Sequence, residues 1–314
     1  MLLRSKLGLI AAATATALVL PAFGQEGETV FHSDARLVVL HATVMDKKGN
    51  FVTDLPATAF RVYEDGVEQQ VKIFRREDVP VSMGIIIDNS GSMRDKRRKV
   101  EQAALGLVKA SNRDDEVFVV NFNDEAWLDV EFTNDLKKLE EGLTQIDSRG
   151  GTAMRDAIDS SIDHLKSKAK KDKKVLLIVT DGNDNTSEIT LERLVQKAQT
   201  REVMVYAIAL LNEEDGREAK RAKRALNTIT QATGGQAFYP EGVDDVYKFA
   251  LDVAHDIRNQ YILAYSPHKQ ELDGTFRQIK VTVNAKNRPT VRTRTGYYAS
   301  AEGTNQAAVA RTHE

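Results

Sequence analysis

The sequence predicts an α/β protein with a doubly wound, mostly parallel sheet, helices on both faces, and a small β-rich unit flanking it. Three observations support this class. Through the middle of the chain, short apolar runs alternate with longer segments of helical periodicity. Two of these runs lead directly into an aspartate, at the strand end where open α/β sheets bind ligands. Near both ends of the chain the pattern changes to short alternating segments typical of β-strands.

Residues 25–78 are expected to form the N-terminal part of the β-rich unit. Residues 37–44 are apolar enough for one strand, and residues 60–64 alternate with period two. Asp65-Gly66 is a turn signal, so residues 68–74 are expected to pair with residues 60–64 as a hairpin. We find no pattern of catalytic or metal-binding residues in this segment.

Residues 79–258 are expected to form the α/β domain. Continuous apolar runs indicate strands buried on both faces, and apolar residues at helical spacing indicate the helices between them. The expected strands are residues 81–87, 116–122, 175–180, 203–210 and 237–239. The expected helices are residues 99–110, 135–146, 152–168, 191–200, 217–233 and 243–257.

Residues 259–300 return to a β pattern. The expected strands are residues 261–265, 276–283 and 291–298. We hypothesise that this segment pairs with the N-terminal β segment, which would make the α/β domain an insertion into one split β unit. Residues 301–314 are polar and rich in alanine, and they are predicted to be disordered.

Residues 1–24 are predicted to be a secretory signal peptide. Arg4 and Lys6 precede an apolar, alanine-rich run, and Ala22 and Gly24 place small residues at a cleavage site. A membrane anchor is the alternative, but the run is short and weakly apolar for a bilayer span. We therefore expect a periplasmic or extracellular protein with no stable membrane span after cleavage.

The composition narrows the function classes. Hydrophobic residues make up 41% and charged residues 29% of the chain, as in ordinary globular proteins. The formal net charge of −2 offers no basic surplus for nucleic acid. There is no cysteine, so an exported chain of this kind is held together by its core, a bound metal, or both.

Three segments carry polar residues of one chemical kind. Asp88, Ser90 and Ser92 follow a buried strand, Thr152 opens a helix, and Asp181 follows another buried strand. The carboxyl ends of the strands share one edge of an open α/β sheet, so these segments are expected to meet. Two carboxylates and three hydroxyls form an oxygen-only donor set, which favours Mg²⁺, with Ca²⁺ or Mn²⁺ as alternatives. Because only two donors are charged, the carboxylate of a partner could complete the coordination.

This pattern resembles the metal-ion-dependent adhesion site (MIDAS) of von Willebrand factor A (VWA) domains. The resemblance covers residues 79–258, in which all five positions are present in the expected order. It implies that the two serines bind one divalent ion directly, and that Thr152 and Asp181 contribute directly or through water. With segments 60–66 and 261–265 on either side, the layout also resembles secreted VWA-related proteins best represented in Acidobacteria.

Other chemistries fit the sequence less well. A haloacid-dehalogenase-like phosphatase needs a second Asp where Ser90 stands, and a nucleophile elbow needs Gly where Asp88 stands. The sequence contains no Gly-Lys-Ser/Thr for a phosphate-binding loop, and its six histidines show no paired metal spacing. We therefore do not expect an enzyme. The lysine-rich residues 166–174 are interpreted as a solvated helix end and loop, with an anion-binding patch as the alternative.

The expected function is that of an exported, metal-dependent protein-binding module, in which the divalent cation bridges to an Asp or Glu of a protein partner. The alternative is a scaffold component of the cell envelope, with a structural metal and with contacts made by the β unit. The residues expected to line the metal face and contact the partner are Asn89, Asn123, Arg149, Gly151, Asn183 and Asp184.

Overall fold

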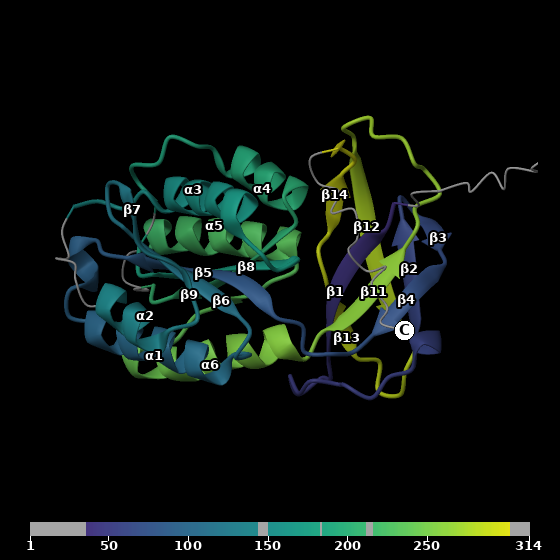
Figure 1. Ribbon diagram of the computed structural model, residues 1–314, viewed down its shortest axis with the longest axis horizontal. Helices are drawn as coiled ribbons and strands as arrows, with labels where there is room; N and C mark the ends of the chain where they lie inside the picture. Colours follow the sequence, from purple (N-terminus) through teal and green to yellow (C-terminus); the bar gives the residue numbers. More distant parts are fainter. Residues whose placement is uncertain (1–35, 144–149, 183, 212–215, 302–314) are drawn as a thin grey trace, which may run out of the picture. The chain divides into compact units, whose positions relative to one another are not determined.

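The computed structural model describes residues 36–143, 150–182, 184–211 and 216–301 (Figure 1). The expected signal peptide and nearly all of the expected C-terminal tail lie outside these residues. No helix among the described residues is both long and apolar enough to cross a lipid bilayer.

A six-stranded sheet forms the centre of the α/β domain. Its strand order is β10-β9-β8-β5-β6-β7. The strands are β5 (Val81–Asp88), β6 (Glu116–Phe122), β7 (Ala126–Thr133), β8 (Lys173–Thr180), β9 (Val203–Ala209) and β10 (Ala237–Phe238). Neighbouring strands are parallel except for β7, which runs antiparallel to β6. The predicted fold class is thereby confirmed.

Helices cover both faces of this sheet (Figure 1). One face carries α3, α4 and α5, and the other carries α1, α2 and α6. Their bounds are α1 (Arg97–Ala110), α2 (Leu136–Leu143), α3 (Met154–Lys168), α4 (Leu191–Thr200), α5 (Arg217–Thr233) and α6 (Val246–Arg258). Short 3-10 turns precede α1 and α6, at Gly91–Met93 and Val243–Asp245.

Strand β5, which leads to the carboxyl edge of the sheet, is buried at all eight of its residues. Alternate side chains of a strand face opposite sides. Ile85 and Ile87 therefore join the core below α1 and α6, whereas Ile86 joins the core below α3. Burial of each such side chain contributes roughly 1.5–3 kcal/mol. This core fixes the position of Asp88, the last residue of the strand.

The remaining strands form two four-stranded sheets, which we call the β unit. Their orders are β13-β1-β11-β4 and β14-β12-β2-β3. The strands are β1 (Val38–Met45), β2 (Phe60–Glu64), β3 (Val67–Gln69), β4 (Val71–Arg75), β11 (Tyr261–Tyr265), β12 (Phe276–Val283), β13 (Thr290–Arg292) and β14 (Gly296–Tyr298). β1 lies between β11 and β13, and β2 pairs with β12, so both ends of the chain contribute to each sheet. Leu40, Val62, Tyr261 and Val281 share one buried cluster.

Three expectations about strands differ from the structure. The segment expected as one strand, residues 291–298, forms the two short strands β13 and β14, which belong to different sheets. The hairpin partner of β2 is only β3, whereas β4 pairs with β11 in the other sheet. Strand β7 was not expected. Val130 is its one buried residue, and an edge strand of that kind lacks the apolar run by which the other strands are recognised. The helix expected at residues 135–146 is α2, and residues 144–146 lie outside the described residues.

The β unit contacts the amino-terminal edge of the central sheet, the edge opposite Asp88. Thr43 Oγ1 donates to Asp256 Oδ1 at 2.5 Å, and Arg292 forms an ion pair with the same buried carboxylate. Arg294 pairs at 2.8 Å with Glu202, the residue before β9. Because these contacts lie at the amino-terminal edge, the β unit does not cover the carboxyl edge, where the polar segments predicted from the sequence lie.

Candidate metal centre

Asp88 is held in place by its neighbours on β5 and β8. These strands are parallel, and Thr180 ends β8 beside Asp88. The Thr180 hydroxyl donates to Asp88 Oδ2 at 2.5 Å, and the Ser90 amide donates to Asp88 Oδ1 at 2.8 Å. The residue is 1% exposed. Both carboxylate oxygens are therefore oriented by hydrogen bonds within the domain.

Ser90 and Ser92 reach Asp181 through a short 3-10 turn. Their hydroxyl oxygens are 3.1 Å apart, and Ser92 Oγ donates to Asp181 Oδ1 at 2.8 Å. Met93 is fully buried in the core below α1, which anchors the turn while Ser92 stays exposed. The side-chain oxygens of two neighbouring serines and of an aspartate 89 residues away thus form one chain of contacts.

Thr152 is positioned by loops that follow β6 and β8. Its amide donates to Asn185 Oδ1 at 3.0 Å, and the Asn185 amide donates to the Thr152 carbonyl at 3.1 Å. The Gly151 amide donates to Asp124 Oδ1 at 2.8 Å. Thr152 Oγ1 lies 3.6 Å from where a Cβ on Gly182 would stand, so its hydroxyl faces the Asp181 loop. Asn185 and Asp124 were not among the predicted site residues.

A cation of the chain itself lies in this cluster. The Lys96 ammonium pairs with Asp181 Oδ2, and the Asp181 side chain is 1% exposed. Lys96 precedes α1 and follows Ser92 by four residues. Lys96 was not among the predicted site residues. The one feature of the sequence that could have indicated it is its position shortly after the predicted metal-binding loop.

The residues present fit a small divalent cation. Among the described residues, no three His, Cys, Asp or Glu side chains are grouped for a metal, so the hydroxyls have to take part. In an octahedral Mg²⁺ site with oxygens at about 2.1 Å, adjacent oxygens are about 3.0 Å apart. The separations of 2.8 and 3.1 Å between the oxygens of Ser92, Asp181 and Ser90 are close to that value. The Lys96 ammonium shows that the cluster already holds a positive charge.

The electrostatics of the site also favour a cation. Burial raises the pKa of Asp88 to about 6, although hydrogen bonds from Thr180 and Ser90 lower it. The nearby carboxylate of Asp181 raises the pKa further. A divalent ion beside these two carboxylates would favour the charged form of Asp88 and so oppose the effect of burial.

Most of the expected partner contacts are used inside the domain. Asn89 is fully buried, donates to Asn121 and accepts from Arg97. Asn123 is 6% exposed, and its carbonyl accepts from the Ala153 amide. Asp184 accepts from the Arg155 amide at 2.7 Å and from the Ser187 hydroxyl. A partner cannot reach the Asn89 side chain, because the core covers it. Arg149 and Asn183 lie outside the described residues.

The architecture and the site define a class of protein, and comparison with known families agrees. The model of the von Willebrand factor type A domain family matches residues 83–251, more than half of the chain. The chain therefore belongs to the VWA domain family. No curated protein matches the sequence.

Several solved structures are similar. A von Willebrand factor type A protein from Catenulispora acidiphila has a TM-score of 0.50 at 11% identity, over 84% of this chain and 75% of that one. Proximal thread matrix protein 1 from the mussel byssus, with a zinc-occupied MIDAS motif, has a TM-score of 0.50 at 15% identity. The match covers 63% of this chain and 50% of the mussel chain. An aerotolerance-related membrane protein from Bacteroides fragilis has a TM-score of 0.46 at 16% identity. The match covers 56% of this chain and 98% of the Bacteroides chain. At these identities the likeness concerns the fold alone.

Proposed function

We propose that this protein is a metal-dependent protein-binding module, in which one divalent cation at the candidate metal centre bridges to an Asp or Glu of a protein partner. The observation that carries the proposal is the donor set. Five protein oxygens with only two carboxylates leave one octahedral position and no surplus negative charge. Ser92, at the outer side of the cluster, is exposed. An outside carboxylate is the ligand that such an ion lacks.

The hydroxyl contacts favour binding over catalysis. Ser90 and Ser92 bond to each other, and Ser92 bonds onward to Asp181. The Asp181 carboxylate that accepts from Ser92 is also paired with the Lys96 ammonium, and among the described residues no histidine bonds to either hydroxyl, so the usual base of an activated nucleophile is missing there. We therefore propose a non-enzymatic role.

We propose Mg²⁺ as the native ion. The oxygen-only donors and their spacing support a hard, octahedral cation. The zinc-occupied MIDAS motif of the mussel protein makes Zn²⁺ a necessary comparison.

From the sequence pattern alone, we further propose export through a signal peptide in residues 1–24 and a relationship to the secreted VWA-related group of Acidobacteria.

The first experiment is calorimetric titration of the metal-stripped protein with Mg²⁺, Mn²⁺, Ca²⁺ and Zn²⁺. We expect one ion per chain, and we expect Asp181→Asn to abolish its binding. Asp114→Asn is the matched control, because Asp114 is exposed and lies at the other end of β6. Binding that survives Asp181→Asn would contradict the proposed site.

Bridging to a carboxylate is tested on the bound ion itself. Mn²⁺ in the site is expected to keep at least one exchangeable water, which enhances water-proton relaxation. Acetate should displace that water and lower the enhancement, whereas acetamide should not.

The role of the metal in partner binding is tested by capture. A partner captured by the immobilised protein should be released by a chelator. If chelation lowers only the melting temperature and leaves capture intact, the metal is structural and the scaffold alternative is favoured.

A further inference from the structure

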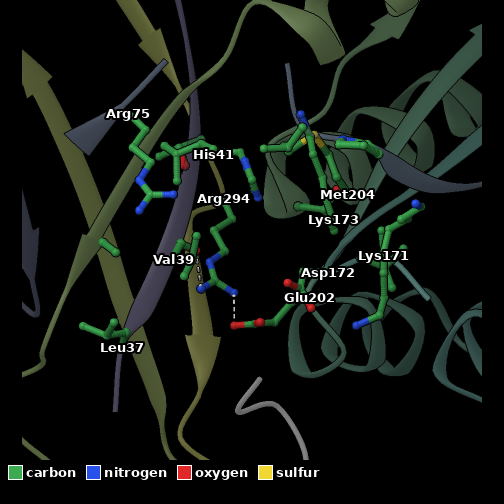
Figure 2. Close-up of a pocket in the computed structure, with 18 of the residues that line it drawn as sticks. Leu37, Val39, His41, Arg75, Lys171, Asp172, Lys173, Glu202, Met204 and Arg294 are labelled. Carbon is green, nitrogen blue, oxygen red and sulfur yellow. Dashed lines mark hydrogen bonds and ion pairs between the residues drawn. The ribbon is translucent and has the colours of Figure 1, made fainter. Parts of the chain in front are cut away.

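A second site lies at the opposite edge of the central sheet. A cavity of about 440 Å³ opens between β1, β4 and β11 of the β unit and the first residues of β8 and β9 (Figure 2). This volume lies within the range of about 300–1,000 Å³ that is typical of small-molecule sites. Val39, Ile73 and Ile262 form an apolar wall on the side of the β unit, and Val203 and Met204 add apolar surface opposite.

The charges that line the cavity are mostly positive. Its basic residues are Arg75, Lys170, Lys171, Lys173, Lys174 and Arg294, and its acidic residues are Glu77, Asp172 and Glu202. Two of these acids are already paired, Glu202 with Arg294 at 2.8 Å and Glu77 with Arg75 at 3.4 Å. Within the described part of the chain, no ion pair joins an acid to Lys170, Lys171 or Lys174. The cavity therefore has a surplus of positive charge beside an apolar wall.

Polar groups around the cavity lack partners. Figure 2 shows His41, from β1, directed across the cavity towards Lys173 and Met204. Among the described residues, His41 Nδ1, Thr293 Oγ1 and Arg294 Nε are buried without a hydrogen-bond partner. All three residues line the cavity. Buried polar groups are nearly always paired in proteins, by protein or by water, so these three atoms are hydrogen-bonding positions in the cavity wall that a ligand or an ordered water can fill.

The pKa of His41 agrees with this surplus of positive charge, whereas the pKa of Lys173 reflects its burial. Burial lowers the pKa of His41 well below its usual value, and the charges of Lys173 and Arg294 lower it further. Burial also lowers the pKa of Lys173 to about 8, against the effect of nearby acids. The Lys173 ammonium donates to the Ile257 carbonyl at 2.6 Å. It is therefore held at the cavity by the end of α6.

We propose that this cavity binds a small organic anion, with its carboxylate on the side of Lys171 and Lys174 and its apolar body along Val39, Ile73 and Ile262. The surplus of positive charge favours an anionic ligand, and the apolar wall favours one with a hydrocarbon portion. Lys171 and Lys174 belong to the lysine-rich residues 166–174, so the proposal favours the anion-binding alternative for that segment over a solvated helix end and loop. This site lies at the sheet edge opposite the metal centre and does not depend on it.

The test uses octanoate as the probe and 1-octanol as the uncharged comparison, by calorimetry on the whole protein. Wild type is expected to bind one octanoate per chain and to bind octanol at least about tenfold more weakly, a difference of about 1.4 kcal/mol. The double variant Lys171→Gln/Lys174→Gln should lose at least about fivefold in octanoate affinity, because two unpaired cations are removed. Its octanol affinity should not change.

Two further variants separate charge from shape. Lys137→Gln/Lys138→Gln removes the same charge from exposed positions on α2, which do not line the cavity, and should bind octanoate as wild type does. Ile73→Trp fills the cavity from its half-buried position and should abolish binding of both probes, with a melting temperature near that of wild type. The proposal is overturned if wild type shows no saturable octanoate binding, if octanol binds equally well, or if the two lysine variants behave alike.

Discussion

Lys96 is the residue whose role at the metal centre is easiest to isolate. It pairs with Asp181 Oδ2, so it competes for this carboxylate with any divalent ion. We expect Lys96→Gln to bind Mn²⁺ about three- to tenfold more tightly than wild type, because a competing unit charge is removed; this corresponds to about 1 kcal/mol. Calorimetric titration of the two proteins measures the difference.

Lys99→Gln is the matched control for this variant. Lys99 lies in the first turn of α1, three residues after Lys96, but pairs with Asp244, whose side chain is 83% exposed. Its removal should leave the Mn²⁺ affinity within about twofold of wild type, because solvent and salt screen a more distant charge. Equal affinities of the Lys96 and Lys99 variants would show that Lys96 does not compete with the ion.

Because the pKa of Asp88 is raised, we expect the stability of the metal-free protein to depend on pH. Its folded-state pKa is about 6, above the ordinary value of 3.8. The stability that this group contributes is therefore fully present below pH 3.8 and is lost as the pH rises through about 6. Asp88→Asn has no such titration. Relative to this variant, metal-free wild type should gain about 1 kcal/mol between pH 7.5 and pH 5, measured by denaturant unfolding at both values. A constant difference would refute the raised pKa.

The same titration has the opposite effect on metal binding. A proton and a divalent ion compete for the Asp88 carboxylate, so the affinity for Mn²⁺ should fall as the pH drops through about 6. At pH 5.5 we expect an affinity several-fold weaker than at pH 7.5. An affinity that does not change over this range would show that Asp88 stays ionised.

At the scale of elements, strand β5 depends on a glycine at its centre. Gly84 pairs with Phe118 on β6, and a Cβ on Gly84 would lie 2.3 Å from the Phe118 ring and 2.6 Å from Leu176 Cδ2. We expect Gly84→Ala to destabilise the fold by roughly 1–3 kcal/mol, because the core has no room for a methyl group. Chemical denaturation measures this change.

Gly242→Ala provides the comparison, since no atom lies within 4 Å of its Cβ position and its φ is −150°. Its effect should stay within about 0.5 kcal/mol, as for most surface substitutions. If both variants lose the same stability, close packing at Gly84 is not the cause.

The elements that sequence reasoning recognised are those with a strong local signal. All eight residues of β5 are buried, and α5 covers the same residues, 217–233, that its periodicity predicted. Strand β7 was not predicted because Val130 is its only buried residue, so it has no apolar run. The length of the hairpin was also misjudged. Asp65-Gly66 predicts a hairpin, but only the neighbouring sheet determines that β4 leaves it to pair with β11.

At the scale of the whole molecule, Asp256 links the α/β domain to the β unit. It is 2% exposed, accepts from Thr43 at 2.5 Å and pairs with Arg292. Asp256→Asn should cost about 3–5 kcal/mol, because it leaves the largely buried Arg292 guanidinium without its counter-charge. Denaturant unfolding, followed by circular dichroism, measures this loss.

Asp244→Asn is the control, because its pair with Lys99 is exposed and such pairs contribute about 1 kcal/mol or less. An Asp256 variant as stable as the Asp244 variant would mean that the contacts between the β unit and the α/β domain contribute little. Two separate unfolding transitions in the Asp256 variant alone would indicate that this carboxylate couples the two parts.

By itself, the sequence determined the fold class and the chemistry of the polar loops. Both are local properties, because periodicity reports burial and because Asp88, Ser90 and Ser92 follow one strand directly. Tertiary structure alone decided which further groups lie beside the predicted donors. The pairing of β5 with β8 brings Thr180 to Asp88, and the packing of α1 brings Lys96 to Asp181. The cavity likewise exists only because β1 comes to face the start of β8, and spacing along the chain carries no information about such long-range contacts.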